Sequence, residues 1–92
     1  MAFRPNFSAA QLDKGGVIVS GNSTDTADIL DITVRLLQGN RVARRSVLKI
    51  DTTWDVRFED EGFGEGPVVA VGIESRRENL MTITWTQTLT IA

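Results

Sequence analysis

LMTITWTQTLTI, residues 80–91, is the stretch that decides the fold class of this chain. Threonine occupies every second position from Thr82 to Thr90, and Met81, Ile83, Trp85, Leu89 and Ile91 occupy the alternate phase. A period of two sends successive side chains to opposite faces of a β-strand. β-Branched threonine also fits a pleated strand better than a helix. The pattern therefore predicts a long antiparallel strand with a polar face toward solvent and an apolar face that packs on a second layer.

Further strand patterns recur through the rest of the chain. Strands are predicted at residues 17–20, 29–37, 41–48, 54–58 and 68–75, with a weak first strand near Phe7. In the strand at residues 29–37, one face carries Leu30, Ile32, Val34 and Leu36. In the strand at residues 68–75, one face carries Val69, Val71 and Ile73. Gly39-Asn40 predicts a hairpin turn, since both residues accept positive φ. Two alternatives stay open: residues 9–11 also fit a helical turn, and residues 47–58 also fit one continuous strand.

The tally of six or seven short strands without a helical pattern is typical of an antiparallel β-sandwich or barrel. Ninety-two residues suit a single domain, 1–92, in which residues 1–14 form a lead-in to the first clear strand. Hydrophobic residues make up 41% of the chain and charged residues 24%, which is the balance of an ordinary globular protein.

Composition excludes several classes of function. The net charge is −2 and the pI is near 5.0, whereas a generic nucleic-acid binder is basic. Cysteine and histidine are absent, which removes the thiol nucleophile, the thiolate metal site and the commonest general base. No enzyme is expected, because no pattern brings two carboxylates into one cleft. We also expect no signal peptide and no membrane span, since the chain lacks an apolar run of the required length.

Several motifs together resemble the bacterial immunoglobulin-like domains. They are Val17-Ile18-Val19-Ser20-Gly21, Ser23-Thr24-Asp25, Thr53-Trp54-Asp55-Val56-Arg57-Phe58 and Gly66-Pro67-Val68-Val69-Ala70-Val71-Gly72. They are similar to that family's V-x-V-S-G-x-A-x-D start, central W-x-V and G-x-Y-x-V-x-A strand. Val68 stands where the family often has an aromatic residue, and no tyrosine is present to form a tyrosine corner.

The resemblance implies an immunoglobulin-like Greek-key sandwich of two antiparallel sheets with about seven strands. It also implies a structural or binding module of bacterial surface or secreted proteins, an extracellular or cell-surface location, and no catalytic residues.

A basic group, Arg41, Arg44 and Arg45 with Lys49 nearby, falls on one predicted strand. Arginines on an edge strand discourage sheets from pairing with one another, and we expect that role here. The alternative is a partner-binding surface for an acidic protein or a phosphate backbone. No aromatic residue is interleaved with these arginines, as stacking on single-stranded nucleic acid would require.

Acidic residues supply the only candidate metal ligands. Glu59, Asp60 and Glu61, with Glu65 nearby, are weak calcium candidates because carboxylate oxygens are the ligands that calcium prefers. Their spacing is not that of an EF-hand, and a solvated loop carries acidic residues in any case, so we expect no cofactor. A lesser acidic group consists of Asp25, Asp28 and Asp31.

Two tryptophans admit two interpretations. Trp54 and Trp85 are in phase with aliphatic neighbours, which predicts core packing rather than a platform for a sugar. Gln87 shares the apolar phase of the final strand and predicts either a bulge or the point where the strand leaves the core.

The sequence therefore predicts a non-enzymatic structural or interaction module whose partners are proteins or neighbouring domains. One alternative is a stand-alone assembly subunit, such as a virion decoration or tail-associated protein, joined through strand edges. Another is a carbohydrate- or calcium-binding sandwich. Oligomeric state is open at this stage.

Overall fold

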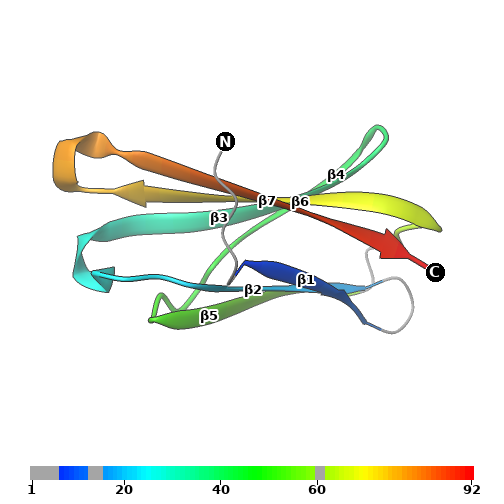
Figure 1. Cartoon of the computed structure of the whole chain (residues 1–92), viewed down its shortest axis with the longest axis horizontal. Coiled ribbons are helices and arrows are strands. Elements are labelled where there is room, and N and C mark those ends of the chain that lie inside the picture. Colours follow the sequence, from blue (N-terminus) through cyan, green and yellow to red (C-terminus); the bar gives the residue numbers. More distant parts are fainter. Residues whose placement is uncertain (1–6, 13–15, 60–61) are drawn as a thin grey trace.

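The computed structural model describes residues 7–12, 16–59 and 62–92, and its regular elements are strands and two short 3-10 turns (Figure 1). The strands are β1 (Ser8–Gln11), β2 (Val17–Asn22), β3 (Ile29–Gln38), β4 (Arg41–Ser46), β5 (Thr53–Phe58), β6 (Gly66–Arg76) and β7 (Thr82–Ile91). The 3-10 turns are η2 (Thr26–Asp28) and η3 (Glu78–Leu80). The prediction of an all-β chain with about seven strands is confirmed.

Two antiparallel sheets face each other across the core (Figure 1). One has the strand order β1-β2-β5, and the other has the order β4-β3-β6-β7. The pairs β2–β5 and β3–β6 join strands that are distant in sequence, which gives the Greek-key sandwich that the sequence predicts. In the constant-type immunoglobulin arrangement the fourth strand lies beside the fifth, in the first sheet. Here β4 pairs with β3 instead, so the fourth strand belongs to the other sheet.

The structure decides between the alternatives left open at the strand ends. Residues 8–11 form a strand, so the helical-turn alternative is wrong. A continuous strand over residues 47–58 is also wrong, because the chain leaves β4 after Ser46 and crosses to the other sheet before β5. Val47 N donates to Ile32 O at 2.8 Å on one side of this crossing, and Asp51 Oδ1 accepts from Thr52 N at 2.7 Å on the other. The predicted hairpin turn is confirmed at Gly39, where φ is 60°.

Three aromatic rings join the two sheets at the centre of the core. Trp54 comes from β5 and Trp85 from β7, and their rings stack at a centroid distance of 6.1 Å and an interplanar angle of 27°. Phe7 packs against both, at 5.6 Å from Trp85 and 6.3 Å from Trp54. The two tryptophans are 5% and 2% exposed, which confirms the prediction that both belong to the core.

Each tryptophan lies over a glycine on the neighbouring strand. Gly21 is the register partner of Trp54, and Gly72 is the register partner of Trp85. A Cβ atom at Gly72 would lie 2.7 Å from Phe7 Cε1 and 2.8 Å from Trp85 Cε3, and one at Gly21 would overlap the Trp54 ring. The missing side chains therefore make the space that the indoles occupy.

This packing sets which face of β6 points inward. Val68, Ala70, Gly72 and Glu74 are buried, whereas the alternate residues Val69, Val71 and Ile73 are half-buried on the outer face of the sheet. The prediction that Val69, Val71 and Ile73 share one face of the strand is confirmed. That face is the outer one, which does not point toward the other sheet. Glycine is required at position 72 of this inner face because the rings of Trp85 and Phe7 fill the space above it.

Local irregularities account for the remaining differences from the predicted faces. A register shift between Ile29 and Asp31 lets Ile29 point inward and leaves Leu30 47% exposed. Met81 precedes β7 and is 48% exposed, so it does not share the buried face of that strand. Gln87 is half-buried opposite Ala70 in an uninterrupted register, so the predicted bulge is absent from β7.

Replacement of Gly72 by alanine tests this packing. We expect Gly72→Ala to lower the free energy of unfolding by about 1–3 kcal/mol, because its methyl group meets two rings that cannot both move aside. Gly64→Ala is the matched control, because a Cβ there meets no atom within 4 Å, and its cost should stay below about 0.5 kcal/mol. Urea unfolding measures both, and equal effects would contradict the proposed role of Gly72.

Candidate functional site

A buried polar chain of side chains connects the two sheets. Glu74, on β6, is 1% exposed, and its Oε1 accepts a hydrogen bond from Ser23 Oγ at 2.7 Å. Ser23 follows β2 in the other sheet, and its Oγ accepts from Trp54 Nε1 at 3.0 Å. The indole that fills the core is thereby tied to a carboxylate across the sandwich. A buried carboxylate is tolerated only where hydrogen bonds and an opposite charge compensate its lost hydration.

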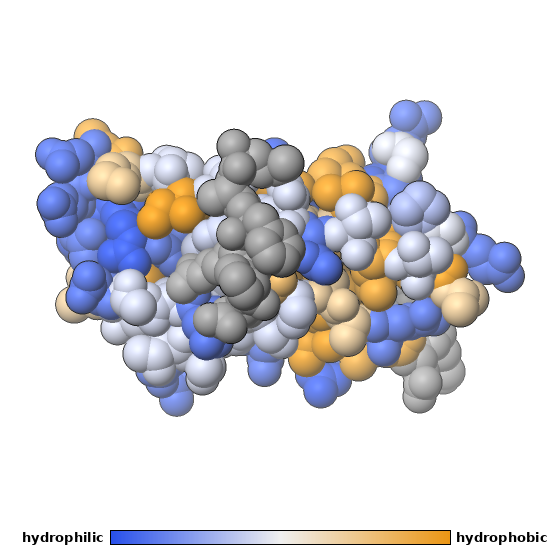
Figure 2. Space-filling view, in the orientation of Figure 1, coloured by the Kyte–Doolittle hydropathy of each residue, from blue (hydrophilic) through white to orange (hydrophobic). Residues whose placement is uncertain are grey.

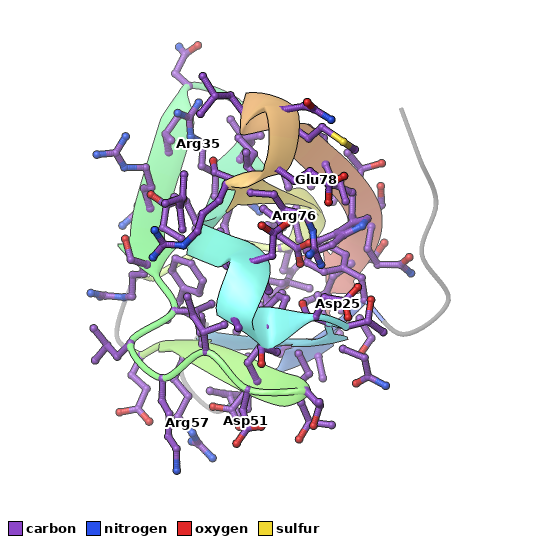
Figure 3. All side chains as sticks on the ribbon, turned by 90° about the vertical axis from the view of Figure 1, so that its left-hand side faces the viewer. Asp25, Arg35, Asp51, Arg57, Arg76 and Glu78 are labelled. Atoms are coloured by element: carbon purple, nitrogen blue, oxygen red, sulfur yellow. The ribbon has the colours of Figure 1, made fainter. Side chains whose placement is uncertain are left out.

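Arg76 supplies that opposite charge at the end of the sandwich where η2 and η3 lie (Figure 3). Its Nε donates to Glu74 Oε2 at 2.8 Å, and its Nη1 lies 3.5 Å from Asp28 Oδ2. Arg76 Nη2 also donates to the carbonyl of Thr24 at 2.6 Å. Burial lowers the pKa of Arg76, but the hydrogen bonds and charges of Glu74 and Asp28 outweigh it, and the pKa is raised above its ordinary value. These partners therefore favour the charged form of the guanidinium.

The same geometry disfavours calcium at Asp25, Asp28 and Asp31. The Arg76 guanidinium contacts both the Asp28 carboxylate and, at 3.4 Å, the Asp25 carbonyl, so a cation already occupies this end. Asp28 Oδ1 also accepts from Glu78 N at 3.2 Å. Asp31 is exposed on β3 and is not part of the contacts that Arg76 makes with Asp25 and Asp28.

The first group of calcium candidates is only partly described. Glu59 is exposed and pairs with Arg57 at 3.2 Å between Oε1 and Nη1, while Asp60 and Glu61 lie outside the described residues. Within residues 7–12, 16–59 and 62–92, no cluster of three or more acidic side chains is placed to hold a metal ion.

The basic group on β4 is split between the two faces of its strand. Arg44 points to the outer face, opposite Arg35 on β3. Arg45 points inward, with its guanidinium 5.6 Å from the centre of the Phe58 ring, and Arg41 covers Phe63 in the same way at 5.4 Å. The arginines therefore do not form one patch, and two of them cover aromatic rings at the margin of the core. β4 does lie at a sheet edge, as predicted.

Phe63 is a core residue that the sequence pattern did not reveal. It lies in the glycine-rich segment before β6 and is only 4% exposed. Gln38 holds that segment in place, because its Nε2 donates to Gly64 O at 2.7 Å and its Oε1 accepts from Gly64 N at 3.0 Å. A single phenylalanine among glycines has no periodicity, so no pattern identifies it in advance.

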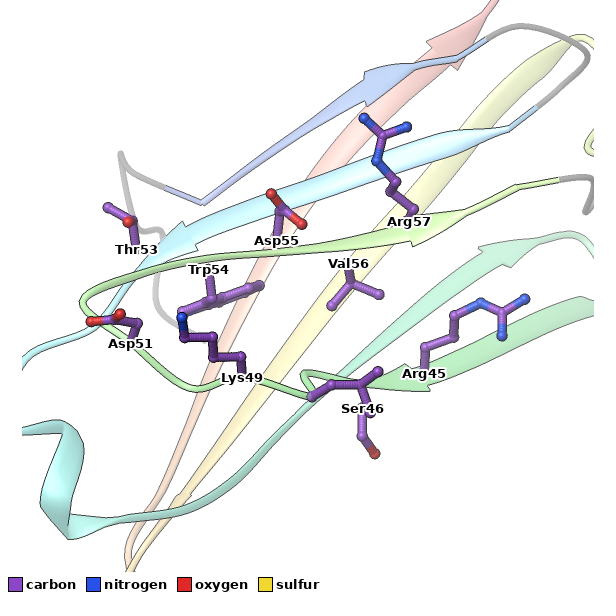
Figure 4. Close-up of a pocket in the computed structure, with 10 residues that line it drawn as sticks. Arg45, Ser46, Lys49, Asp51, Thr53, Trp54, Asp55, Val56 and Arg57 are labelled. Carbon is purple, nitrogen blue, oxygen red and sulfur yellow. The ribbon is translucent and has the colours of Figure 1, made fainter.

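An open groove of about 630 Å³ lies between β5 and the segment that joins it to β4 (Figure 4). Trp54 and Val56 form its floor, and Asp55 and Arg57 point away from them on the other side of β5. Leu48, on the opposite wall, is 99% exposed. Arg45, Lys49 and Asp51 bring charge to the groove, and Asp55 and Arg57 border it from the outer face of β5. Both signs of charge, an apolar floor and an exposed leucine are features of a protein-binding surface.

The opposite flank, formed by β1 and β7, is occupied by the chain itself. β1 contacts β7, and Gln11 Oε1 accepts a hydrogen bond from Ala92 N at 3.2 Å. In the coloured part of Figure 2, which faces this flank, hydrophobic residues show as separate patches among hydrophilic ones. We therefore take the groove beside β5 as the candidate functional site.

Comparison of the chain with protein-family models, with curated proteins and with solved structures found no match. Neither of the 3-10 turns in the described part of the chain has the length or the apolar character needed to cross a membrane.

Arg76 offers a direct test of the polar chain. We expect Arg76→Ala to lower the free energy of unfolding by about 3 kcal/mol, because it removes the guanidinium that pairs with the buried Glu74 carboxylate. Arg77→Ala is the control, since this neighbouring side chain is exposed, and it should cost less than about 0.5 kcal/mol. Chemical denaturation measures the free energy of unfolding of both variants. An Arg76→Ala variant as stable as the control would refute the role of the ion pair.

Proposed function

We propose that this chain is a non-enzymatic structural or interaction module, in which a stiff sandwich presents its edges and loops to protein partners. The observation that carries the proposal is the double connection between the sheets: the Trp54–Trp85 stack and the chain from Trp54 through Ser23 to Glu74. Such a connection resists sliding of one sheet over the other, because a shift breaks ring packing and buried hydrogen bonds together.

Two carboxylates, Glu74 and Asp28, support this proposal by the contacts they make. Glu74 is held by Ser23 and Arg76, and Asp28 by Arg76 and the backbone of Glu78. A general base must instead reach a substrate proton in an accessible cleft. These carboxylates are engaged in holding the sandwich together.

The resemblance to bacterial immunoglobulin-like domains is part of the proposal, as are a bacterial origin and a location at the cell surface. Several residues of the motifs have structural roles that such a module needs. Val17 and Val19 are completely buried, Gly21 makes room for Trp54, and Trp54 is the centre of the core. The motif thus corresponds to the residues that connect the sheets, which supports a common architecture rather than a common ligand.

Partner binding is assigned to the side of the sandwich where β4 and β5 lie. Arg44 is exposed on β4, and the groove beside β5 combines an apolar floor with charges of both signs. Arg45 lines the groove and its guanidinium covers Phe58, whereas Arg41 covers Phe63 and does not line the groove. We place the protein contact at this side because it offers exposed strand edges that the described strands do not cover.

A second candidate function is that of a stand-alone assembly subunit, such as a virion decoration or tail-associated protein. The specific observation in its favour is the exposed edge of β5, through which sheets of neighbouring subunits can join. A sugar-binding module has less support, because Trp54 and Trp85 are only 5% and 2% exposed and pack against each other and Phe7 in the core.

Metal dependence separates a purely structural module from a calcium-binding one. We expect the chain to unfold in one cooperative transition whose midpoint is the same in excess calcium and in excess chelator, because Arg76 supplies the cation at the acidic end. Differential scanning calorimetry gives the midpoint and tests two-state behaviour. A midpoint that falls when chelator is added would instead support the calcium-binding alternative.

A further inference from the structure

In the described part of the chain, β5 has a neighbouring strand on one side only. Among the described strands β5 pairs only with β2, and the groove of about 630 Å³ lies along its other side. In the constant-type immunoglobulin arrangement a fourth strand fills this position. Here the fourth strand, β4, pairs with β3 in the other sheet. The backbone groups on the outer edge of β5 are therefore available to an added strand.

The sequence of β5 is charge-complementary to itself. Val56 lies between Asp55 and Arg57, which carry opposite charges. An aromatic residue flanks this group at each end, Trp54 before it and Phe58 after it. We propose that the edge of β5 binds β5 of a second copy of this chain, antiparallel and with Val56 on the twofold axis. Asp55 then lies opposite Arg57 of the second copy, and the same pair recurs across the axis. This inference rests on the interaction role proposed above and names the partner.

The faces of the strand agree with this arrangement. Asp55 and Arg57 lie on one side of β5, and Trp54 and Val56 lie on the other, toward the core (Figure 4). Residues directly opposite each other in a sheet share a face, so the added strand places charges beside charges in solvent and apolar residues beside apolar residues. The result is a continuous six-stranded sheet across the two copies, in which opposite charges face one another twice.

The other edges do not offer the same complementarity. β4 carries three arginines in six residues, and no acidic residue balances them if β4 meets a second β4. On the opposite flank, β1 lies along β7 and hydrogen-bonds its end through Gln11. β5 is thus the strand edge whose charges attract an identical copy.

The size of the contact sets its strength. A strand of six residues is about 20 Å long and adds about six backbone hydrogen bonds, which makes a small interface. Leu48, on the groove wall and 99% exposed, adds apolar surface that a second copy covers. Interfaces of this size are weak, so we expect a dissociation constant in about the micromolar to millimolar range.

Charge reversal tests the pairing directly. We expect sedimentation equilibrium of the wild-type chain to show a reversible monomer–dimer equilibrium. Asp55→Arg and Arg57→Asp should each weaken the dimer about tenfold or more, because each places like charges opposite each other twice. The double variant Asp55→Arg with Arg57→Asp should restore it, and an equimolar mixture of the two single variants should form a heterodimer. Arg77→Asp, at an exposed position between β6 and η3, is the control and should leave the dimer unchanged.

Two results overturn the inference. One is a chain that stays monomeric at the highest soluble concentration, which would leave the β5 edge for a strand of a different protein. The other is a dimer that the single reversals do not weaken, which would place the contact elsewhere. Folding of each variant is checked by circular dichroism, and both positions are exposed, so folding should be retained. Neither result affects the chelator experiment, which tests the structural module independently.

Discussion

The stacking of Trp54 on Trp85 is the interaction on which the rest of this structure depends. Each indole comes from a different sheet, and each needs a glycine on the next strand because a methyl group there would overlap a ring. Gly72 in turn fixes the phase of β6, so the inner face of that strand carries Val68, Ala70 and Glu74, and Val69, Val71 and Ile73 lie on the outer face. The position of Glu74 is therefore a consequence of how the aromatic core is packed.

A carboxylate in that position requires compensation, and the chain provides it from both sheets. Ser23 and Arg76 each donate to one oxygen of Glu74, and every buried side-chain nitrogen or oxygen in the described residues has a partner. Replacing such a network with apolar residues is often neutral for stability, and we infer that its role here is to fix how the sheets meet. A sandwich with a single permitted arrangement holds its edges in a constant geometry, which is what an interaction module or an assembly subunit needs.

Much of the fold can be predicted from the sequence, because alternation is a local property. The threonine strand, the Gly39 turn and the burial of both tryptophans are predicted in this way. What could not be predicted depends on contacts between distant segments. The phase of β6 at Gly72 follows from Phe7 and Trp85, and the exposure of Leu30 follows from a register shift. Phe63 joins the core cluster from outside the strands, with Arg41 over its ring. The groove could not be predicted for the same reason. It lies beside β5 at the position that β4 leaves open by pairing with β3 in the other sheet.

The claim that Trp54 links the core to the polar network is tested most directly by a double-mutant cycle on the free energy of unfolding. Ser23→Ala and Trp54→Phe each remove one partner of the same hydrogen bond, which spans 3.0 Å between Nε1 and Oγ. If the two residues act together, the cost of the double variant falls short of the sum of the single costs by about 1 kcal/mol. Costs that add without any such difference would show that the two residues act separately and would contradict this account.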